Sequence, residues 1–136
     1  MARSVLVDAG FLVAMLSKRD LHHRWAVQQV PGNQPPWFTC EAVLSEAHHL
    51  LGERGAPGLR AMLSRRAVVA KFHLDDHVEA VAALLRKYES VPMSLADACL
   101  VRMSETLADP VLLTTDSDFR IYRRHSRQVL PCIMPR

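Results

Sequence analysis

Apolar and polar positions along this chain change repeatedly from the period of a strand to the period of a helix. Residues 3–8 form a short β-branched run that predicts a strand, after which Phe11, Leu12, Met15 and Leu16 recur at the spacing of one helix face. Further strands are predicted at 36–39, 68–74, 111–115 and 128–133, the last as an edge strand. Strands that alternate with helices at such short spacings predict an α/β fold, with a central parallel sheet of about five strands and helices on both faces.

Capping residues and helix breakers indicate where the other helices begin and end. We expect helices to start at Asp20, Thr39, Pro57, Asp75, Ser94 and Phe119. Pro31 and Gly32 would end the first of these, and Gly55 would close the second, which is expected over 40–54. The last is a short helix over 119–124.

The length and composition suit one soluble domain. A chain of 136 residues, 49% of them hydrophobic, can bury one core, so we expect a single domain over 1–136. No run of about 18 apolar residues occurs, and Asp8 interrupts the apolar segment that a leader peptide would need. We therefore expect a cytoplasmic protein with no membrane association. The three cysteines are too few and too far apart for a disulfide framework or a zinc knuckle.

Four acidic residues lie within or beside apolar runs, where a carboxylate loses its hydration. Asp8 and Asp116 each follow a strand, and Glu46 and Asp97 lie in apolar helical segments. Separate cationic partners would require many buried bases, whereas one shared divalent cation would satisfy all four acids. Because the carboxyl ends of parallel strands meet at one edge of a sheet, we expect Asp8 and Asp116 to lie close together there.

Each acid also has a structural explanation of its own. Asp8 and Asp116 could be turn residues that accept hydrogen bonds from backbone amides. Asp97 lies three residues after Ser94 and could complete a capping box. Glu46 could be an ordinary exposed helix residue. The occurrence of all four acids together, in this order, favours a shared site.

The segments that carry these acids resemble the PIN-domain nuclease family, particularly its VapC-type toxin ribonucleases, across nearly the whole chain. The resembling segments are 7–14, 39–51, 92–98 and 113–119. The resemblance implies a Mg²⁺- or Mn²⁺-dependent endoribonuclease whose catalytic, metal-binding residues are Asp8, Glu46, Asp97 and Asp116. Oxygen ligands suit these two ions and disfavour zinc. One metal, or two about 4 Å apart, would activate water for attack on a phosphodiester. Glu46 would be either a further ligand or the group that positions this water.

The chain departs from the family pattern beside the first acid. Many relatives carry Thr or Ser there, whereas this chain has Ala9 and Gly10, so Thr114 or Thr115 would have to supply any hydroxyl contact. Asp118 also lies within the last motif. Because it precedes Phe119, we interpret Asp118 as an auxiliary residue that caps a helix rather than as a ligand.

The basic residues suggest where RNA would bind. The formal net charge is +3, and Arg120, Arg123 and Arg124 have the spacing of one helix face close to Asp116. Arginine is suited to forked contacts with phosphate, so these residues are candidates for RNA binding. The alternative is that they form an ordinary solvated helix face.

Partners are predicted in part by apolar surface. The expected helices carry more apolar residues than so small a chain can readily hide, and the resemblance implies that part of this surface forms a homodimer. These residues are Phe11, Met15, Leu16, Trp25, Val30, Leu59, Met62 and Leu63. The resemblance implies an RNA substrate, whether tRNA, rRNA or mRNA, and a groove for a cognate antitoxin protein.

Two other functions remain open. The chain could be a non-catalytic PIN module that binds RNA or an antitoxin, although all four acids are present. It could also be a phosphotransferase that uses Asp116 and Asp118 as an Asp-x-Asp nucleophile motif. Such motifs usually follow the first strand of their fold, whereas this one follows a late strand.

Overall fold

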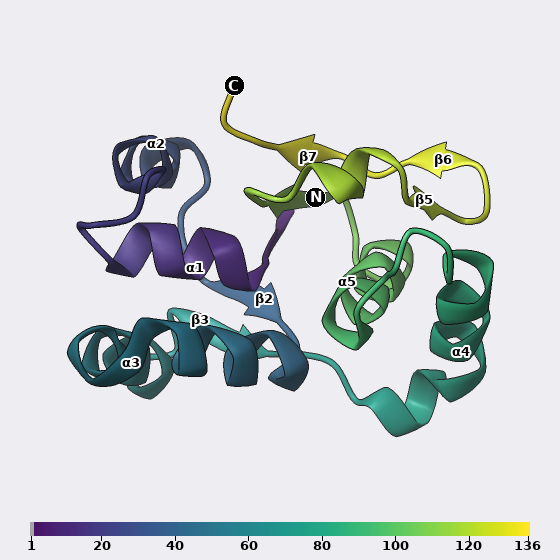
Figure 1. Ribbon diagram of the computed structural model, residues 1–136, viewed down its shortest axis with the longest axis horizontal. Coiled ribbons are helices and arrows are strands. Elements are labelled where there is room, and N and C mark those ends of the chain that lie inside the picture. Colours follow the sequence, from purple (N-terminus) through teal and green to yellow (C-terminus); the bar gives the residue numbers. More distant parts are fainter. Residues whose placement is uncertain (1) are drawn as a thin grey trace.

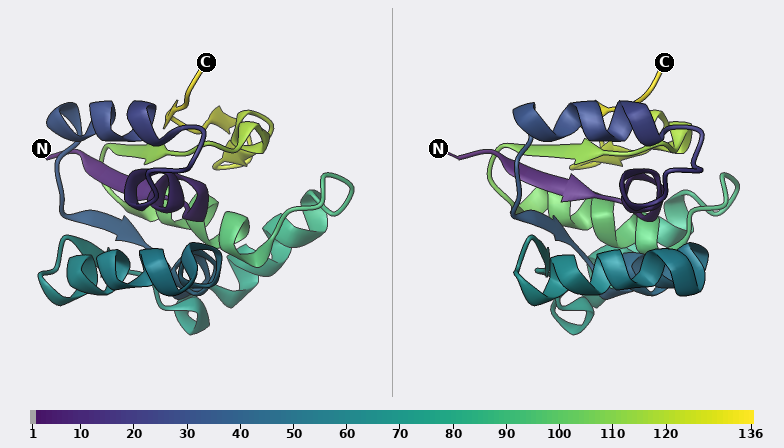
Figure 2. Two further views of the ribbon diagram at one scale, coloured as in Figure 1. Left: turned by 60° about the vertical axis from the view of Figure 1, so that its left-hand side comes forward. Right: turned by 90° about the vertical axis from the view of Figure 1, so that its left-hand side faces the viewer.

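A five-stranded parallel sheet forms the centre of the computed structural model, which describes residues 2–136 (Figure 1). The strands are β1 (Ser4–Val7), β2 (Trp37–Thr39), β3 (Val68–Ala70), β4 (Pro110–Leu113) and β7 (Cys132–Ile133). Their order in the sheet is β3-β2-β1-β4-β7, and every pairing is parallel. The strands therefore end at a common edge (Figure 2). This architecture confirms the predicted α/β fold.

Helices lie on both sides of this sheet, as the alternating pattern predicted. They are α1 (Ala9–Leu16), α2 (His23–Gln29), α3 (Glu41–Ser64), α4 (Val78–Lys87) and α5 (Leu95–Thr106). In Figure 1, α1 and α2 lie on the left, α4 and α5 lie on the right, and α3 runs beneath α1. Helix α3 contacts both α1 and α5, so it connects the two sides.

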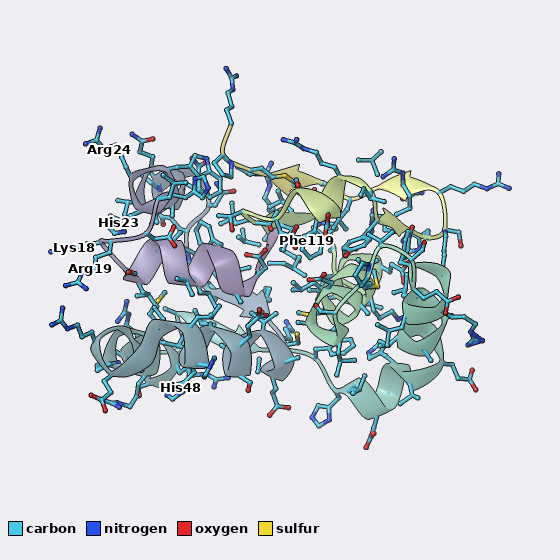
Figure 3. All side chains as sticks on the ribbon, in the orientation of Figure 1. Lys18, Arg19, His23, Arg24, His48 and Phe119 are labelled. Carbon is cyan, nitrogen blue, oxygen red and sulfur yellow. The ribbon has the colours of Figure 1, made fainter. Side chains whose placement is uncertain are left out.

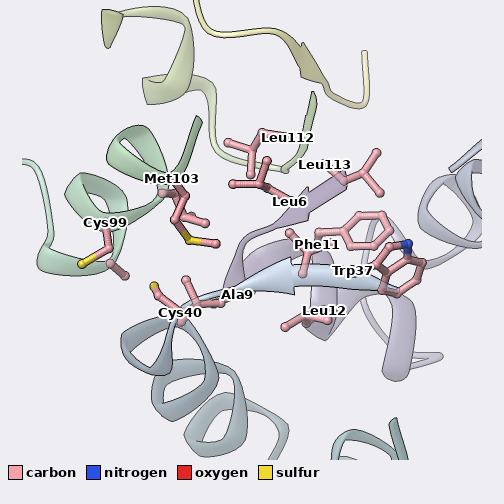
Figure 4. Packing of buried hydrophobic residues seen from close by; sticks show 14 of the residues in the cluster. Leu6, Ala9, Phe11, Leu12, Trp37, Cys40, Cys99, Met103, Leu112 and Leu113 are labelled. Atoms are coloured by element: carbon pink, nitrogen blue, oxygen red, sulfur yellow. The ribbon is translucent and has the colours of Figure 1, made fainter. Parts of the chain in front are cut away.

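The core is built on the two central strands. All four residues of β1 and all four of β4 are buried, and the two strands pair in register from Ser4 opposite Pro110 to Val7 opposite Leu113. Phe11 packs edge-on against Trp25 and Trp37, with ring centroids 5.9 and 5.3 Å away. Figure 4 shows Phe11 beside Trp37. This burial of apolar surface is the main favourable contribution to folding, and it holds the start of α1 against the strand ends.

Helix α3 differs from the prediction in its start and its length. Cys40, not Thr39, is its N-cap, because the Thr39 hydroxyl donates instead to the Val7 carbonyl over 2.8 Å. The predicted break at Gly55 is also wrong. Two helical segments continue through to Ser64 and join across a kink at Gly52, whose φ of 63° and ψ of −165° are not helical.

The predicted helix over 119–124 is wrong as well. A 3₁₀ helix, η3 (Ser117–Arg120), is followed by an antiparallel hairpin of β5 (Arg123–Arg124) and β6 (Gln128–Val129). His125 and Ser126, with φ of 48° and 68°, form the turn. The Arg123 amide donates to the Tyr88 hydroxyl over 3.0 Å instead of to a carbonyl one turn back, so the segment does not continue as a helix. The predicted strand over 128–133 is consequently split into β6 and β7.

The apolar residues that predicted a dimer surface are mostly used inside the molecule. Phe11, Leu59 and Met62 are buried, and the others, namely Met15, Leu16, Trp25, Val30 and Leu63, are partly buried and pack against the core. Their abundance therefore reflects core packing, and that argument for a dimer is wrong. Within residues 2–136, no helix is both long and apolar enough to cross a membrane.

Candidate active site: an acidic cleft at the strand ends

A cleft of about 340 Å³ opens where β1 and β4 end. Five acids line it, namely Asp8, Glu46, Asp97, Asp116 and Asp118, and they come from the end of β1, from α3, from α5 and from η3. Of the described residues that line the cleft, none is Lys, Arg or His. The structure thus brings all four of the acids predicted from the sequence to one cavity, together with Asp118.

Asp8 is the most buried of these acids, with 6% of its surface exposed. As the N-cap of α1, its Oδ1 accepts a hydrogen bond from the Phe11 amide over 2.7 Å, and its Oδ2 accepts one from the Thr114 hydroxyl. Burial raises the pKa of Asp8 to about 7, and the nearby charges of Asp116 and Asp97 raise it further, against the lowering effect of the two hydrogen bonds. Asp8 is thus both a turn residue and a cleft residue.

Thr114 connects the two carboxylates at the strand ends. The register of β1 against β4 pairs Val7 with Leu113, so Asp8 and Thr114 are the next residues on adjacent strands. The Thr114 hydroxyl donates to Asp8 and accepts a hydrogen bond from the Asp116 amide over 2.9 Å. Thr114 therefore supplies the hydroxyl contact that Ala9 cannot.

Asp116, rather than Asp118, caps the 3₁₀ helix that follows β4. The Oδ1 atom of Asp116 accepts a hydrogen bond from the Asp118 amide over 2.9 Å, so the interpretation of Asp118 as the cap is wrong. The Asp118 side chain lines the cleft instead.

Asp97 is held at the first turn of α5 by a capping box. Its amide donates to the Ser94 hydroxyl over 3.0 Å, and its Oδ2 accepts from the Ser94 amide over 3.4 Å. The Tyr122 hydroxyl donates to the same Oδ2 over 3.0 Å. Burial raises the pKa of Asp97, and its hydrogen bonds with Tyr122 and Ser94 oppose that rise. The capping explanation is correct, and it does not prevent Asp97 from lining the cleft.

Glu46 is exposed and reaches the cleft from α3. Val43 and Leu50, one turn to either side, line the same cavity, as expected of one helix face. The apolar helical segment that carries Glu46 therefore borders the cleft.

A close approach of backbone to side chain shapes the floor of the cleft. A Cβ atom on Gly10 would overlap the Thr115 hydroxyl, and both residues line the cavity. Glycine after Ala9 therefore makes room for Thr115 beside Asp8.

The cleft offers oxygen donors to a cation, but these donors do not converge on one position. Within residues 2–136, no group of three or more His, Cys, Asp or Glu side chains is close enough to hold a metal ion as it stands. The donor set nevertheless fits a hard cation such as Mg²⁺ or Mn²⁺, because it consists of carboxylates with no neighbouring base to neutralise them.

The three arginines predicted to share a helix face do not do so. Arg120 ends η3 and is exposed, whereas Arg123 and Arg124 belong to β5. The Arg123 guanidinium donates to the backbone carbonyls of 120, 121 and 122, and Arg124 donates to the Ser104 carbonyl in α5. Arg123 and Arg124 therefore help to hold the hairpin in place, and Arg120 alone keeps an exposed side chain.

Other basic side chains gather far from the acids. Figure 3 shows Lys18, Arg19 and Arg24 at the end of the molecule where α1 finishes and α2 begins. Lys18 and Arg19 line a second groove with Arg54, beyond the carboxyl end of α1, whereas Asp8 lies at the amino end of that helix.

One residue that contacts the acidic set was missed from the sequence, namely Tyr122. It lies six positions beyond Asp116, in a segment expected to be helical, and nothing in the local pattern indicates its contact with Asp97. Only the packing of η3 and the hairpin on α5 creates that contact.

Comparison with known proteins identifies one matching family and a similar solved structure. The sequence model of the PIN domain family matches residues 5–124. No curated protein matches the chain. Among solved structures, the chain is similar to the crystal structure of VapC20 from Mycobacterium tuberculosis, a sarcin-ricin loop cleaving toxin. The TM-score is 0.71 and the identity 23%, over 85% of this chain and 92% of that one. The family match confirms the resemblance to PIN domains drawn from the four acidic segments, and the structural match shows a shared fold.

Proposed function

The chain belongs to the PIN domain family, and from this premise we propose that it is a Mg²⁺- or Mn²⁺-dependent endoribonuclease. The observation that carries the proposal is the cleft in which five carboxylates from four parts of the chain meet without a basic residue. Such an arrangement costs free energy through repulsion and lost hydration unless a cation binds there.

The acidic side chains would have different roles in such a site. Asp8, Asp97 and Asp116 would hold the cation, with Asp8 kept in orientation by the Phe11 amide and the Thr114 hydroxyl. Bound Mg²⁺ or Mn²⁺ would acidify a water and stabilise the charge that develops on the phosphodiester. Glu46, exposed at the cleft margin, would bind the cation or orient the attacking water. Because no three acids among residues 2–136 are close enough to bind one ion, small side-chain movements would accompany binding.

The substrate and partner are proposed from the relatives. VapC20 is a toxin that cleaves the sarcin-ricin loop, and its similarity in fold supports a role for this chain as the ribonuclease toxin of a toxin–antitoxin pair. We propose RNA as the substrate class and a cognate antitoxin protein as the inhibitor. Cytoplasmic location and the extension of the domain over 1–136 remain predictions.

The decisive experiment is cleavage of defined RNAs, including a sarcin-ricin loop hairpin and a tRNA, with Mn²⁺ or with EDTA, and with products mapped to the nucleotide. Wild-type protein should cleave only with metal, and Asp8→Asn and Asp97→Asn should reduce cleavage by roughly 100-fold or more. Asp76→Asn is the matched control, because Asp76 is an exposed acid outside the cleft. Cleavage by Asp97→Asn at the wild-type rate would refute the metal assignment.

The same experiment separates the two alternatives. A non-catalytic PIN module would bind these RNAs without cleaving them in either metal. A phosphotransferase would form an acyl phosphate on Asp116 that alkali or hydroxylamine cleaves, and mass spectrometry detects it after incubation with a phosphate donor. We favour the nuclease because Asp116 is already engaged in capping η3 and is joined to Asp8 through Thr114.

A further inference from the structure

A buried phenol contacts the carboxylate of Asp97 from outside the cleft. Tyr122 lies between η3 and β5, has no exposed surface, and donates its hydroxyl hydrogen to Oδ2 of Asp97 over 3.0 Å. Among the described residues that line the cleft, Tyr122 does not occur. It can therefore influence the carboxylate without touching a ligand in the cavity.

The hydrogen bonds of Asp97 distinguish its two oxygens. Oδ2 accepts from Tyr122 and, more weakly, from the Ser94 amide over 3.4 Å. Oδ1 accepts no hydrogen bond from the residues that the structure describes. Two donors on one oxygen restrict rotation of the carboxylate and leave the other oxygen available.

The position of the phenol is itself fixed by packing. Its ring lies edge-on against Tyr88 and Phe119, with centroids 5.2 and 5.3 Å away. Phe119 is fully buried and belongs to η3, the helix that Asp116 caps. The aromatic cluster therefore links the segment that carries Asp116 to the helix that carries Asp97.

The chemical nature of the donor matters as much as its position. An arginine or lysine at this place would neutralise Asp97 and compete with a bound cation. A phenol donates one hydrogen bond and brings no charge. Asp97 thus gains orientation and keeps its negative charge for the cleft.

We propose that Tyr122 is a positioning residue of this site, which holds Oδ2 of Asp97 so that Oδ1 is the oxygen presented to a bound cation. The inference rests on the proposed function, because it assigns Asp97 to a metal site. Outer partners of ligating carboxylates typically contribute about 10–100-fold to metal affinity. Loss of the Tyr122 hydroxyl should therefore weaken metal binding even though the residue never contacts the metal.

The two tyrosines of this chain provide a matched pair of variants. Tyr88 is also buried, packs in the same cluster, and accepts a hydrogen bond from the Arg123 amide over 3.0 Å, away from any carboxylate. Calorimetric titration with Mn²⁺ in the absence of RNA should show about tenfold or greater loss of affinity in Tyr122→Phe and less than about threefold loss in Tyr88→Phe. In the cleavage assay, Tyr122→Phe should need more Mn²⁺ for half-maximal rate and should recover most of its rate at saturation.

A second measurement uses the wild-type protein and does not depend on how the variants fold. Tyrosine labelled with ¹³C at Cζ gives two signals, one from each tyrosine. Addition of Mg²⁺ should draw charge from Asp97 and shift the Tyr122 signal, while the Tyr88 signal stays in place. The signal of each tyrosine is the one that remains when the other tyrosine is replaced by Phe. If a variant does not fold, the signal is assigned from the aromatic rings that neighbour that tyrosine.

The possible results separate this inference from the proposed function. Loss of Mn²⁺ affinity in Tyr122→Phe alone, with a Mg²⁺-dependent shift of its signal in wild type, supports the positioning role. The positioning role would be overturned if Tyr122→Phe and Tyr88→Phe bind Mn²⁺ with equal affinity. It would also be overturned if wild-type protein binds Mg²⁺ without a shift of the Tyr122 signal. Either result would leave the nuclease proposal standing. A wild-type protein that binds neither ion would overturn both.

Discussion

Individual carboxylates in the cleft have two functions at once. Asp8 caps α1, Asp97 completes the capping box of α5, and Asp116 caps η3, yet all three line the same cavity. A cap places its side chain at the amino end of a helix, where the helix dipole favours negative charge. The fold thereby orients acidic side chains toward a common space at a lower cost than burial of free carboxylates would require.

Asp8→Asn should stabilise the metal-free protein above neutral pH. The pKa of Asp8 is raised to about 7 from 3.8, so between these values the folded protein binds more protons than the unfolded chain. Wild-type stability therefore falls as pH rises from about 4 to about 7, by up to about 4 kcal/mol. Asparagine caps helices as well as aspartate does, so the variant should lack this decline.

Urea unfolding in EDTA at pH 4, 6 and 8 measures the effect. The variant should gain most over wild type at pH 8 and little at pH 4. Asp76→Asn, which alters an exposed acid, serves as the control and should keep the wild-type pH dependence. If the stability difference between Asp8→Asn and wild type does not change with pH, the pKa of Asp8 is not raised on folding.

At the scale of elements, the kink in α3 depends on one glycine. Gly52 has φ of 63° and ψ of −165°, a region that residues with a Cβ atom almost never occupy. An added Cβ would have open space around it, so the cost of Gly52→Ala is one of backbone conformation and not of contact. We expect the variant to lose about 1–3 kcal/mol of stability.

Chemical unfolding of Gly52→Ala beside Gly32→Ala tests this expectation. Gly32 also has open space around an added Cβ, but it has no positive φ, so its replacement should change stability little. If the two variants lose similar amounts of stability, the positive φ at Gly52 does not explain the cost of its replacement.

Arg120 at the end of η3 and Arg124 in β5 have different roles. Arg124 donates to the Ser104 carbonyl in α5, so Arg124→Ala should lower stability by about 1–3 kcal/mol. Arg120 is exposed, so Arg120→Ala should leave stability unchanged and reduce the salt dependence of RNA binding by roughly one unit of slope, if it contacts one phosphate.

Filter binding across a range of salt concentrations, in EDTA to prevent cleavage, measures the slope for each variant. Thermal unfolding of the same samples measures stability. An unchanged slope for Arg120→Ala would favour the solvated-surface explanation, and full stability of Arg124→Ala would contradict its role in holding the hairpin.

At the scale of the whole molecule, the prediction of a homodimer now depends on different residues. Leu21 is 89% exposed and precedes α2, and Val27 is exposed on that helix. If this region forms the interface, wild-type protein should sediment as a dimer at micromolar concentration and Leu21→Asp as a monomer. Val129→Asp is the control, because Val129 is a comparably exposed apolar residue on the distant hairpin. A monomeric wild type at tens of micromolar would refute the dimer.

The distribution of charge over the molecule indicates how a polyanion could approach. Carboxylates occupy the cleft at the amino end of α1, and Lys18, Arg19 and Arg54 line a groove beyond its other end. An acidic cleft alone repels RNA, so the proposed function requires both the cation and basic surface elsewhere.

The sequence by itself determined the alternation of strands and helices through α5 and β4, the parallel sheet and the four acids that meet in the cleft. These follow from local periodicity, from runs such as Val5 to Val7, and from the rule that parallel strands end together. It also indicated the capping box of Ser94 and Asp97, because that signal depends on residues three positions apart.

Only the tertiary structure decided how distant segments contact one another. Phe119 and Tyr122 have a spacing compatible with a helix, but Tyr122 packs against Tyr88, the chain turns into a hairpin, and the Tyr122 hydroxyl contacts Asp97. The Thr39 hydroxyl, expected to cap α3, instead bonds to the Val7 carbonyl on the neighbouring strand. The physical reason is the same in both cases: packing and hydrogen bonds across more than twenty residues can outweigh local preferences, and no local pattern records them.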